Sequence, residues 1–410
     1  MRKTSGSGIG STIFGLLIWA CIGFAAYNFF FADGDDITGN YGFDVESGSV
    51  EALNYDLPEN RNKYYELDTL GKELYGTLRD SIAAGKSTVY FHSLDYDDFE
   101  DTIYDAFDAL YYDFPEFFWL NGGWSCQASQ AENINLVDIS FEPGFYEYWS
   151  YTTDKDGYID AALSEAKRIA AMAATVDGKF EKVKFVHDYL VVNAEYDYVC
   201  LEELNKTVQR ASSQQSHTIY GCLVNKVCVC DGYSKSFQLI MNMLDIDCEL
   251  VLGNAGGGHA WNYVVLDGEA YWMDITWDEN EQADESGDLY APHGANYDYF
   301  CVTDEHLYKT HTPEDTFKVP VCNATEYNFF HHENSYLESY SFDAVCDAVT
   351  EQAGSQIIHI RFATPSALDE ALDELVQKGR FEDAPGMKEL YRNTKFFYST
   401  ASNTLHIYLP

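Results

Sequence analysis

Basic side chains are scarce in this 410-residue sequence. It has 25 lysines and arginines against 67 aspartates and glutamates, which gives a formal net charge of −42 at pH 7. A surface this acidic repels the phosphates of nucleic acids and the headgroups of anionic lipids. We therefore predict no nucleic-acid partner.

The sequence also lacks the short motifs that hold common cofactors and metals. It contains no phosphate-binding loop, no dinucleotide-binding fingerprint and no Cys-x-x-Cys pair. The closest approach to a calcium loop, around Asp154 and Gly157, has Leu163 at the position where a bidentate carboxylate belongs. A turn that leads into a helix explains this segment better. We expect no cofactor, no calcium regulation and no structural zinc.

The remaining composition is that of a folded protein with more than one packed unit. Apolar residues make up 46% and aromatic residues 16% of the chain, which separates it from acidic disordered proteins. A length of 410 residues exceeds one typical core and predicts two or three units. Ten cysteines are present. Cys21 lies in the uncharged N-terminal segment and Cys230 is a candidate nucleophile; the other eight form an even count compatible with disulfides in an oxidising exterior.

One long uncharged segment lies at the N-terminus. Residues 4–32 carry no charged side chain, and Ile9–Phe31 would span roughly 35 Å as a helix, enough to cross a bilayer. Two basic residues precede the run and three aspartates follow it closely, which favours an N-terminus inside and the bulk of the chain outside. We predict that residues 1–32 anchor a single-pass membrane protein. The alternative is a signal sequence whose cleavage yields a secreted protein.

Beyond this segment, the pattern of apolar residues predicts a tether and three units. Residues 33–54 are rich in glycine, serine and acids, as expected of a tether. We expect an N-terminal α/β accessory unit at 55–150, a core at 151–335 and a small C-terminal α/β unit at 336–410. In the first unit, periodicity predicts helices over Asn60–Ala84 and Asp97–Tyr112, and strands over Val89–His92, Phe117–Leu120 and Asn135–Phe141.

The residue types for nucleophilic catalysis gather in the core, beginning with Cys230. The segment Cys230-Asp-Gly232-Tyr233 leads into Ser234–Leu244, whose apolar residues recur at helical spacing. Cys230 is therefore predicted to lie at a helix N-terminus. The free N–H groups and positive end of a helix stabilise a thiolate, and they can also hold the oxyanion of an acyl intermediate.

A predicted hairpin brings a histidine and an aspartate together. A strand over His259–Leu266 ends at Asp267-Gly268, the signature of a two-residue hairpin. Such a turn pairs Leu266 with Glu269 and places Asp274, on the returning strand, on the same face as His259. A four-residue loop would keep this relation, whereas a three-residue loop would reverse it. On one face, the carboxylate can orient the imidazole.

These three segments resemble the transglutaminase-like superfamily. Its motifs are a Cys-x-Gly-Tyr helix start, a His-Ala-Trp-Asn strand and an Asp-x-Thr-Trp-Asp strand, and all three occur here in that order, at 230–233, 259–262 and 274–278. Including a lead-in around His187 and His217, the resemblance covers about residues 180–280. It implies an α+β fold, a papain-like arrangement of a helix on an antiparallel sheet, with a Cys230, His259 and Asp274 triad.

The resemblance leaves two kinds of function open. The first is an extracytoplasmic cysteine acyl-transfer enzyme that acts on peptide or protein amides, including those of the cell wall or cell surface. An amine acceptor would make it a transglutaminase, and water would make it an amidase or peptidase. The second is a catalytically inactive scaffold or interaction protein that keeps the fold without turnover.

Overall fold

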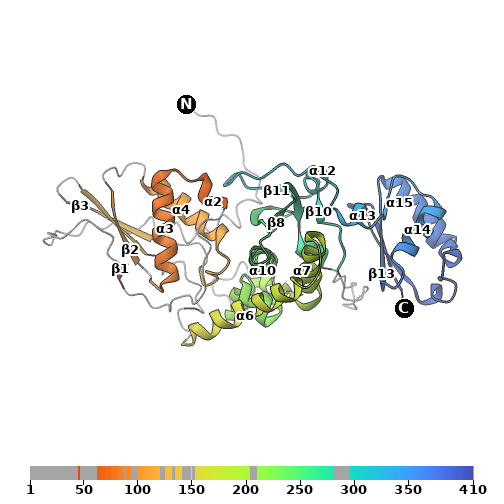
Figure 1. The fold of residues 1–410 in the computed structure, drawn as a ribbon, viewed down its shortest axis with the longest axis horizontal. Coiled ribbons are helices and arrows are strands. Elements are labelled where there is room, and N and C mark those ends of the chain that lie inside the picture. Colours follow the sequence, from red (N-terminus) through yellow and green to blue (C-terminus); the bar gives the residue numbers. More distant parts are fainter. Residues whose placement is uncertain are drawn as a thin grey trace, which may run out of the picture.

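The computed structural model describes residues 45–46, 62–86, 88–93, 99–120, 125–131, 134–140, 149, 153–203, 210–279 and 295–409. They form three units that follow one another along the long axis of the molecule (Figure 1). No helix in these ranges is long and apolar enough to cross a bilayer. The predicted anchor, residues 1–32, lies outside the described residues.

The N-terminal unit packs helices against a four-stranded sheet. The predicted helix over Asn60–Ala84 is instead two helices, because Asp68 caps the second one by accepting the N–H of Gly71 at 2.7 Å. The predicted strand Phe117–Leu120 is wrong: its three aromatic residues lie in and beside turns, Leu120 makes a single β-bridge, and all four are buried in the core. The helices are α2 (Asn62–Glu66), α3 (Thr69–Ala83) and α4 (Phe99–Asp113), and the sheet has the order β1 (Val45–Glu46), β2 (Thr88–Ser93), β4 (Ile134–Ser140), β3 (Ser125–Ala131).

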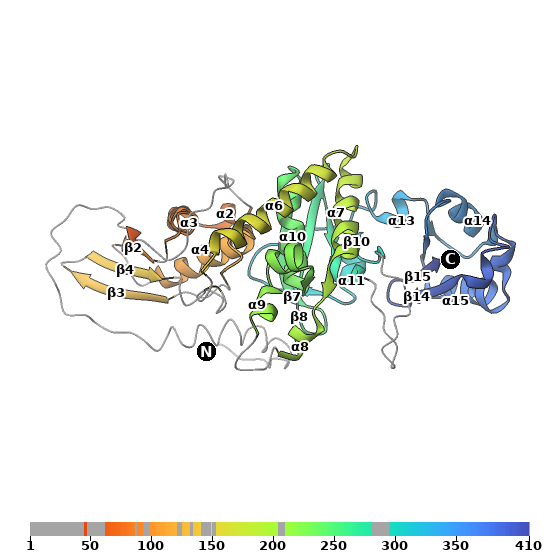
Figure 2. The same ribbon diagram turned by 90° about the horizontal axis from the view of Figure 1, so that it is seen from below.

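The core unit is a five-stranded sheet with a central helix packed on it. The order is β10 (Phe300–Val302), β9 (Glu269–Met273), β8 (Gly258–Leu266), β7 (Cys248–Asn254), β11 (Thr312–Pro313), and every pairing is antiparallel. Helix α10 (Cys230–Met243) lies against β7 and β8, with α6 (Lys155–Ala173) and α7 (Lys179–Asn193) beside it (Figure 2). This mixed architecture confirms the predicted α+β class.

Shorter elements connect these parts of the core. They are β5 (Glu195–Tyr196), α8 (Tyr198–Glu203), α9 (Ala211–Gln215), η2 (Gly221–Asn225), β6 (Val227–Cys228), α11 (Ile275–Asp278), α12 (Asp304–Leu307) and α13 (Phe329–His332). The strands β5 and β6 form a separate parallel pair. That pair leads the chain directly into the first turn of α10.

The C-terminal unit has its own sheet and hydrophobic core. After a short first strand, its main elements run in the order helix, strand, helix and two strands. Its polar side chains reach the core unit at Asp298: Arg361 donates to the carbonyl oxygen at 2.7 Å, and Thr404 donates to Oδ2 at 3.1 Å. The elements are β12 (Tyr336–Leu337), α14 (Phe342–Glu351), β13 (Ile357–Phe362), α15 (Pro365–Ala371), η3 (Leu372–Gln377), η4 (Arg380–Asp383), η5 (Tyr391–Asn393), β14 (Lys395–Ser399) and β15 (Thr404–Tyr408).

The even cysteine count is compatible with disulfides, but none is present among the cysteines whose side chains the structure describes. All eight of these are free thiols, and seven of them are buried. A buried thiol packs as a small apolar group, which explains the abundance of cysteine without cross-links. The eight are Cys200, Cys222, Cys228, Cys230, Cys248, Cys301, Cys322 and Cys346.

Candidate functional site

Cys230 is the first residue of α10, as the sequence predicts. Val229 before it has an extended backbone and donates its N–H to the carbonyl of Ser216 at 3.0 Å. Gly232 allows this approach: a Cβ there would lie 2.5 Å from the Ser216 carbonyl oxygen and 2.7 Å from the Cβ of Cys228. The turn at 216–218 therefore fixes the first turn of α10, and with it the position of Cys230.

Replacing Gly232 with alanine is expected to destabilise the protein by about 2 kcal/mol or more, since overpacking a tight site costs roughly 1–3 kcal/mol and a backbone oxygen cannot move aside. The matched control is Gly76→Ala in α3, where a Cβ would meet nothing within 4 Å. That change should stabilise by about 0.5–1 kcal/mol, because alanine favours a helix. The urea midpoint of the full chain measures both. Equal shifts in the two variants would contradict the close packing.

The hairpin that carries His259 has the predicted register. Asp267 and Gly268 both have positive φ, 51° and 89°, and Leu266 pairs with Glu269. The returning strand is shorter than predicted, however, because β9 ends at Met273. The expected strand over 274–278 is instead the helical turn α11, and its N-cap is Asp274, whose Oδ1 accepts the N–H of Trp277 at 3.1 Å. Aspartate favours such a cap, which ends the strand.

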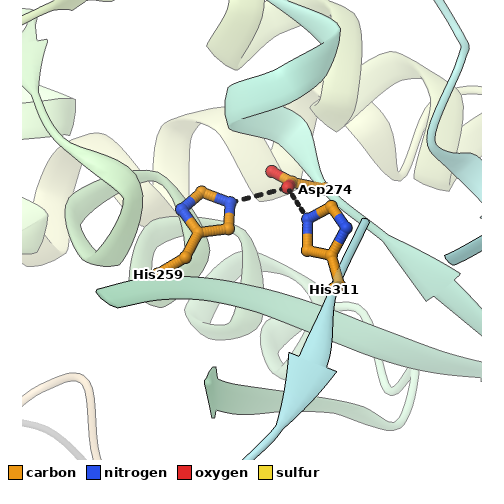
Figure 3. A group of neighbouring side chains, drawn as sticks. All are labelled: His259, Asp274 and His311. Carbon is orange, nitrogen blue, oxygen red and sulfur yellow. Dashed lines mark hydrogen bonds and ion pairs between the residues drawn. The ribbon is translucent and has the colours of Figure 1, made fainter. Parts of the chain in front are cut away.

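His259 and Asp274 meet in spite of this change. The Nε2 atom of His259 lies 2.7 Å from Oδ2 of Asp274 (Figure 3). Asp274 is fully buried, and His259 is 7% exposed. Burial by itself raises the pKa of Asp274, but the charge of His259 and hydrogen bonds from His259 and His311 bring it below its usual range. The carboxylate is therefore ionised and can accept the Nε2 proton of the imidazole.

Hydrogen bonds hold helix α10 against the strand of His259. Ser234 lies one helical turn after Cys230, and its hydroxyl donates to the carbonyl of Ala260 at 3.0 Å. In return, the side-chain amide of Asn262 donates to the carbonyl of Ser234 at 3.1 Å. Cys230 lies one helical turn from Ser234, and His259 is the residue before Ala260, so both lie close to these hydrogen bonds. The helix and the strand are thus fixed in register at the point where the two residues face each other.

The thiol of Cys230 interacts with the imidazole of His259. Burial lowers the pKa of His259, but the charges of Asp274 and Cys230, together with hydrogen bonds to both, raise it to about 10. Because Nε2 is bound to Asp274, the nitrogen left for the thiol is Nδ1. The structure therefore brings the three residues that the sequence singles out together at the N-terminus of α10.

A second histidine, His311, shares the carboxylate and was not predicted. Its Nε2 lies 3.0 Å from the same Oδ2 of Asp274 (Figure 3). It precedes the short edge strand β11, which pairs with β7 and so brings the histidine back to the site. No motif surrounds His311 in the sequence, and it lies 37 residues from Asp274. Only the tertiary fold could reveal this contact.

The residue after the cysteine, Asp231, carries a negative charge that is compensated locally. His217 lies with Nδ1 3.0 Å and 3.1 Å from its two carboxylate oxygens, and the ammonium of Lys235 is 3.8 Å away. Burial lowers the pKa of His217, but Asp231 and Cys200 raise it well above its ordinary value. The two cations offset a carboxylate that would otherwise oppose a thiolate at Cys230.

The N-terminal unit contributes to the wall around Cys230. Tyr112 of α4 belongs to one apolar cluster with Cys230, and Tyr111 and Phe317 pack against that cluster. The carbonyl of Tyr112 accepts a hydrogen bond from the side-chain amide of Gln238 at 2.9 Å. The hydroxyl of Tyr111 accepts a hydrogen bond from the ammonium group of Lys235 at 2.8 Å. Cys230 is 6% exposed. A substrate must therefore reach the sulfur past aromatic side chains of α4.

One group of candidate metal ligands occurs in the part of the chain that the structure describes. It consists of His259, Asp274 and His311, whose ligand atoms lie within 4.8 Å of one another. Two imidazoles and a carboxylate can bind zinc. The nitrogen–oxygen distances of 2.7 Å and 3.0 Å are those of hydrogen bonds, which account for each of these atoms without a metal.

A comparison with protein families covers the same segment. Residues 166–276 match the family model described as the transglutaminase-like superfamily. The matched range contains Cys230, His259 and Asp274 but ends before His311. The resemblance predicted from the sequence is confirmed, and no curated protein matches the chain.

Solved structures show only a distant likeness. A transglutaminase is 16% identical with a TM-score of 0.27, and the match covers 49% of this chain and 54% of that one. A candidate cysteine protease from Cytophaga hutchinsonii is 14% identical with a TM-score of 0.22, over 35% and 52% of the two chains. A candidate protease from Parabacteroides distasonis is 12% identical with a TM-score of 0.20, and the match covers 37% of this chain and 36% of that one. The chain thus spans about half or less of the length of each of these three structures.

Proposed function

We propose that this transglutaminase-like protein is a cysteine acyl-transfer enzyme that acts on peptide or protein amides. The observation that carries the proposal is the placement of Cys230 at the N-terminus of α10, where its thiol influences the charge of His259, together with the 2.7 Å contact from His259 to Asp274. A nucleophile, a base and a group that orients the base are the parts that covalent acyl transfer needs. The match to the superfamily supports the same reaction class.

In the first half of the proposed reaction, the Cys230 thiolate attacks the carbonyl carbon of a carboxamide. A carbon–sulfur bond forms, and the carbonyl electron pair moves onto oxygen. The backbone N–H of Cys230, the first residue of α10, has no acceptor in a preceding helical turn and can hold this oxyanion, whereas the N–H of Gly232 already donates to Oδ1 of Asp231. His259 then gives its Nδ1 proton to the leaving amine as the carbon–nitrogen bond breaks, leaving a thioester on Cys230.

In the second half, an amine or water attacks the thioester. The neutral His259 accepts the proton of the attacking group at Nδ1, the carbon–sulfur bond breaks and the thiolate returns. Throughout both halves, Asp274 accepts the Nε2 proton and keeps the ring in the tautomer with Nδ1 toward sulfur. The choice between amine and water decides between a transglutaminase and an amidase or peptidase.

The proposed place of action is outside the cell membrane. Its support is the uncharged segment at 4–32 with basic residues before it and aspartates after it. A body on the outer side would meet wall peptides, surface proteins and secreted proteins as substrates. Cleavage of the segment would give a secreted enzyme with the same substrates.

The second candidate is an inactive scaffold with a transglutaminase-like fold. The observation that favours it is the low exposure of both proposed catalytic side chains, 6% for Cys230 and 7% for His259, beneath aromatic residues of α4. A scaffold could keep these side chains as core residues. An enzyme would need α4 or its tyrosines to move when substrate binds.

An assay with the full chain separates these functions. The protein is incubated with a glutamine-containing protein and a labelled primary amine, and label, ammonia and peptide fragments are measured. Incorporated label supports a transglutaminase, whereas ammonia without label supports an amidase and fragments support a peptidase. The scaffold is supported if all three products stay at background.

A further inference from the structure

We propose that His311 is a positioning residue: it donates its Nε2 proton to Asp274 and so fixes the carboxylate that orients His259. This inference rests on the proposed function of the same site. His311 lies outside the segment matched by the superfamily, and its position depends on how β11 folds back beside β7.

The two histidines converge on one oxygen of Asp274 from different elements. His259 comes from β8 and His311 from the segment before β11, and Figure 3 shows both rings directed at the carboxylate. The Nε2–Oδ2 distances are 2.7 Å for His259 and 3.0 Å for His311. The other oxygen, Oδ1, accepts the N–H of Trp277 at 3.1 Å. Three donors therefore determine the plane of a fully buried carboxylate.

The hydrogen bonds around His311 have a defined direction. An ionised carboxylate only accepts, so Nε2 of His311 must carry a proton. Its Nδ1 lies 2.7 Å from the hydroxyl of Thr310, which can donate to it, and the hydroxyl of Tyr299 lies 3.2 Å from that of Thr310. The hydrogen bonds from Tyr299 through Thr310 thus hold the His311 ring with Nε2 directed at Asp274.

Aromatic contacts also hold the His311 ring. Its centroid lies 4.6 Å from that of Trp277 and 5.0 Å from that of Trp261, the latter in an edge-to-face arrangement. The side chain is completely buried, and Asp274 lies between it and His259. The ring centroid of His311 also lies 5.5 Å from that of His259. His311 therefore acts on the reaction through Asp274 and through this ring contact, without touching the substrate.

Removing the imidazole would leave Oδ2 with one donor and free the carboxylate to turn about its Cβ–Cγ bond. The tautomer and orientation of His259 depend on that carboxylate. A misplacement of about 1 Å in a catalytic group lowers the rate on the order of a hundredfold. Because binding of substrate does not involve His311, the loss should fall on kcat and leave KM nearly unchanged.

Three variants of the full chain test this role. The amide nitrogen of glutamine is as many bonds from Cα as Nε2 of histidine, so His311→Gln keeps a neutral donor for Asp274. The amide of His311→Asn is at the position of Nδ1 and cannot reach it, and His311→Leu has no donor. We expect kcat to fall about tenfold to a hundredfold in the Asn and Leu variants, and less than about fivefold in the Gln variant. Equal losses in Gln and Leu, or no loss in Leu, would overturn the proposal.

A readout without turnover separates this proposal from the proposed function. The Nε2 proton of His259, bound to a carboxylate, gives a downfield imidazole signal in the NMR spectrum of the resting protein. The signal should stay in His311→Gln and broaden or shift in His311→Leu, even if the wild-type protein transfers no acyl group. An unchanged signal in the Leu variant, with the protein folded by circular dichroism, would refute the positioning role alone.

Discussion

Replacing Cys230 with alanine is expected to lower kcat for acyl transfer by at least about 10⁴-fold, because no other group at this helix N-terminus can form the thioester. The side chain is small and lies at the edge of an apolar cluster. Its loss should therefore change stability by less than about 1 kcal/mol. The measurement is the rate of ammonia release or label incorporation, together with the urea midpoint.

The matched control is Cys228→Ala, two residues upstream. Cys228 is also a free and fully buried thiol, but it packs beneath Gly232. Burial, contact with Cys222 and nearby acids raise its pKa well above the ordinary value, so it stays a neutral thiol. This variant should keep kcat within about threefold. Activity that survives in Cys230→Ala, or that disappears equally in Cys228→Ala, would contradict the assignment of the nucleophile.

Replacing Asp274 with asparagine is expected to lower kcat on the order of 10³–10⁴-fold. Three N–H donors, from His259, His311 and Trp277, point at the carboxylate. An amide of the same shape has only one accepting oxygen, so its NH₂ group must face one of these donors. The arrangement that relieves this conflict moves the proton of His259 from Nε2 to Nδ1. The nitrogen that faces Cys230 would then no longer be a base.

The matched control for this change is Asp304→Asn at the start of α12. The Oδ1 atom of Asp304 accepts the indole N–H of Trp272 at 2.8 Å and the N–H of Cys322 at 3.2 Å. The amide oxygen of asparagine can accept both bonds, so activity should stay within a few-fold. Equal rates in the two variants would show that Asp274 has no special part in the reaction. Measuring both kcat and the urea midpoint of each variant shows whether a loss of activity reflects catalysis or lost stability.

The sequence could predict the parts of the site that depend on local structure. Cys230 lies at the start of a segment whose apolar residues recur at helical spacing. The length of the two-residue turn at Asp267-Gly268 determines the register between the strand that carries His259 and the returning strand. The family motif then connects both to Asp274. The error at 274–278, a helical turn instead of a strand, left the carboxylate within reach because Asp274 caps that turn.

Other contacts could not be predicted because they join segments that are far apart in the chain. His311 reaches Asp274 only when β11 pairs with β7, and β11 is a two-residue strand without a recognisable pattern. The compensation of Asp231 by His217 depends on the packing of the turn at 216–218 on α10. The aromatic run at 117–119 has the composition of a strand but lies in and beside buried turns, because the burial of its side chains decided its conformation.

The central claim is that His259 activates Cys230, and the rate of alkylation tests it most directly. The full chain is treated with iodoacetamide at pH 7, and each cysteine is followed by mass spectrometry. Cys346, which is more exposed than Cys230, is the internal reference. If His259 holds a thiolate at Cys230, that residue should react at least about tenfold faster than Cys346, and His259→Gln should remove the difference. Modification of Cys346 before Cys230, or a rate at Cys230 that does not change in His259→Gln, would contradict an activated nucleophile.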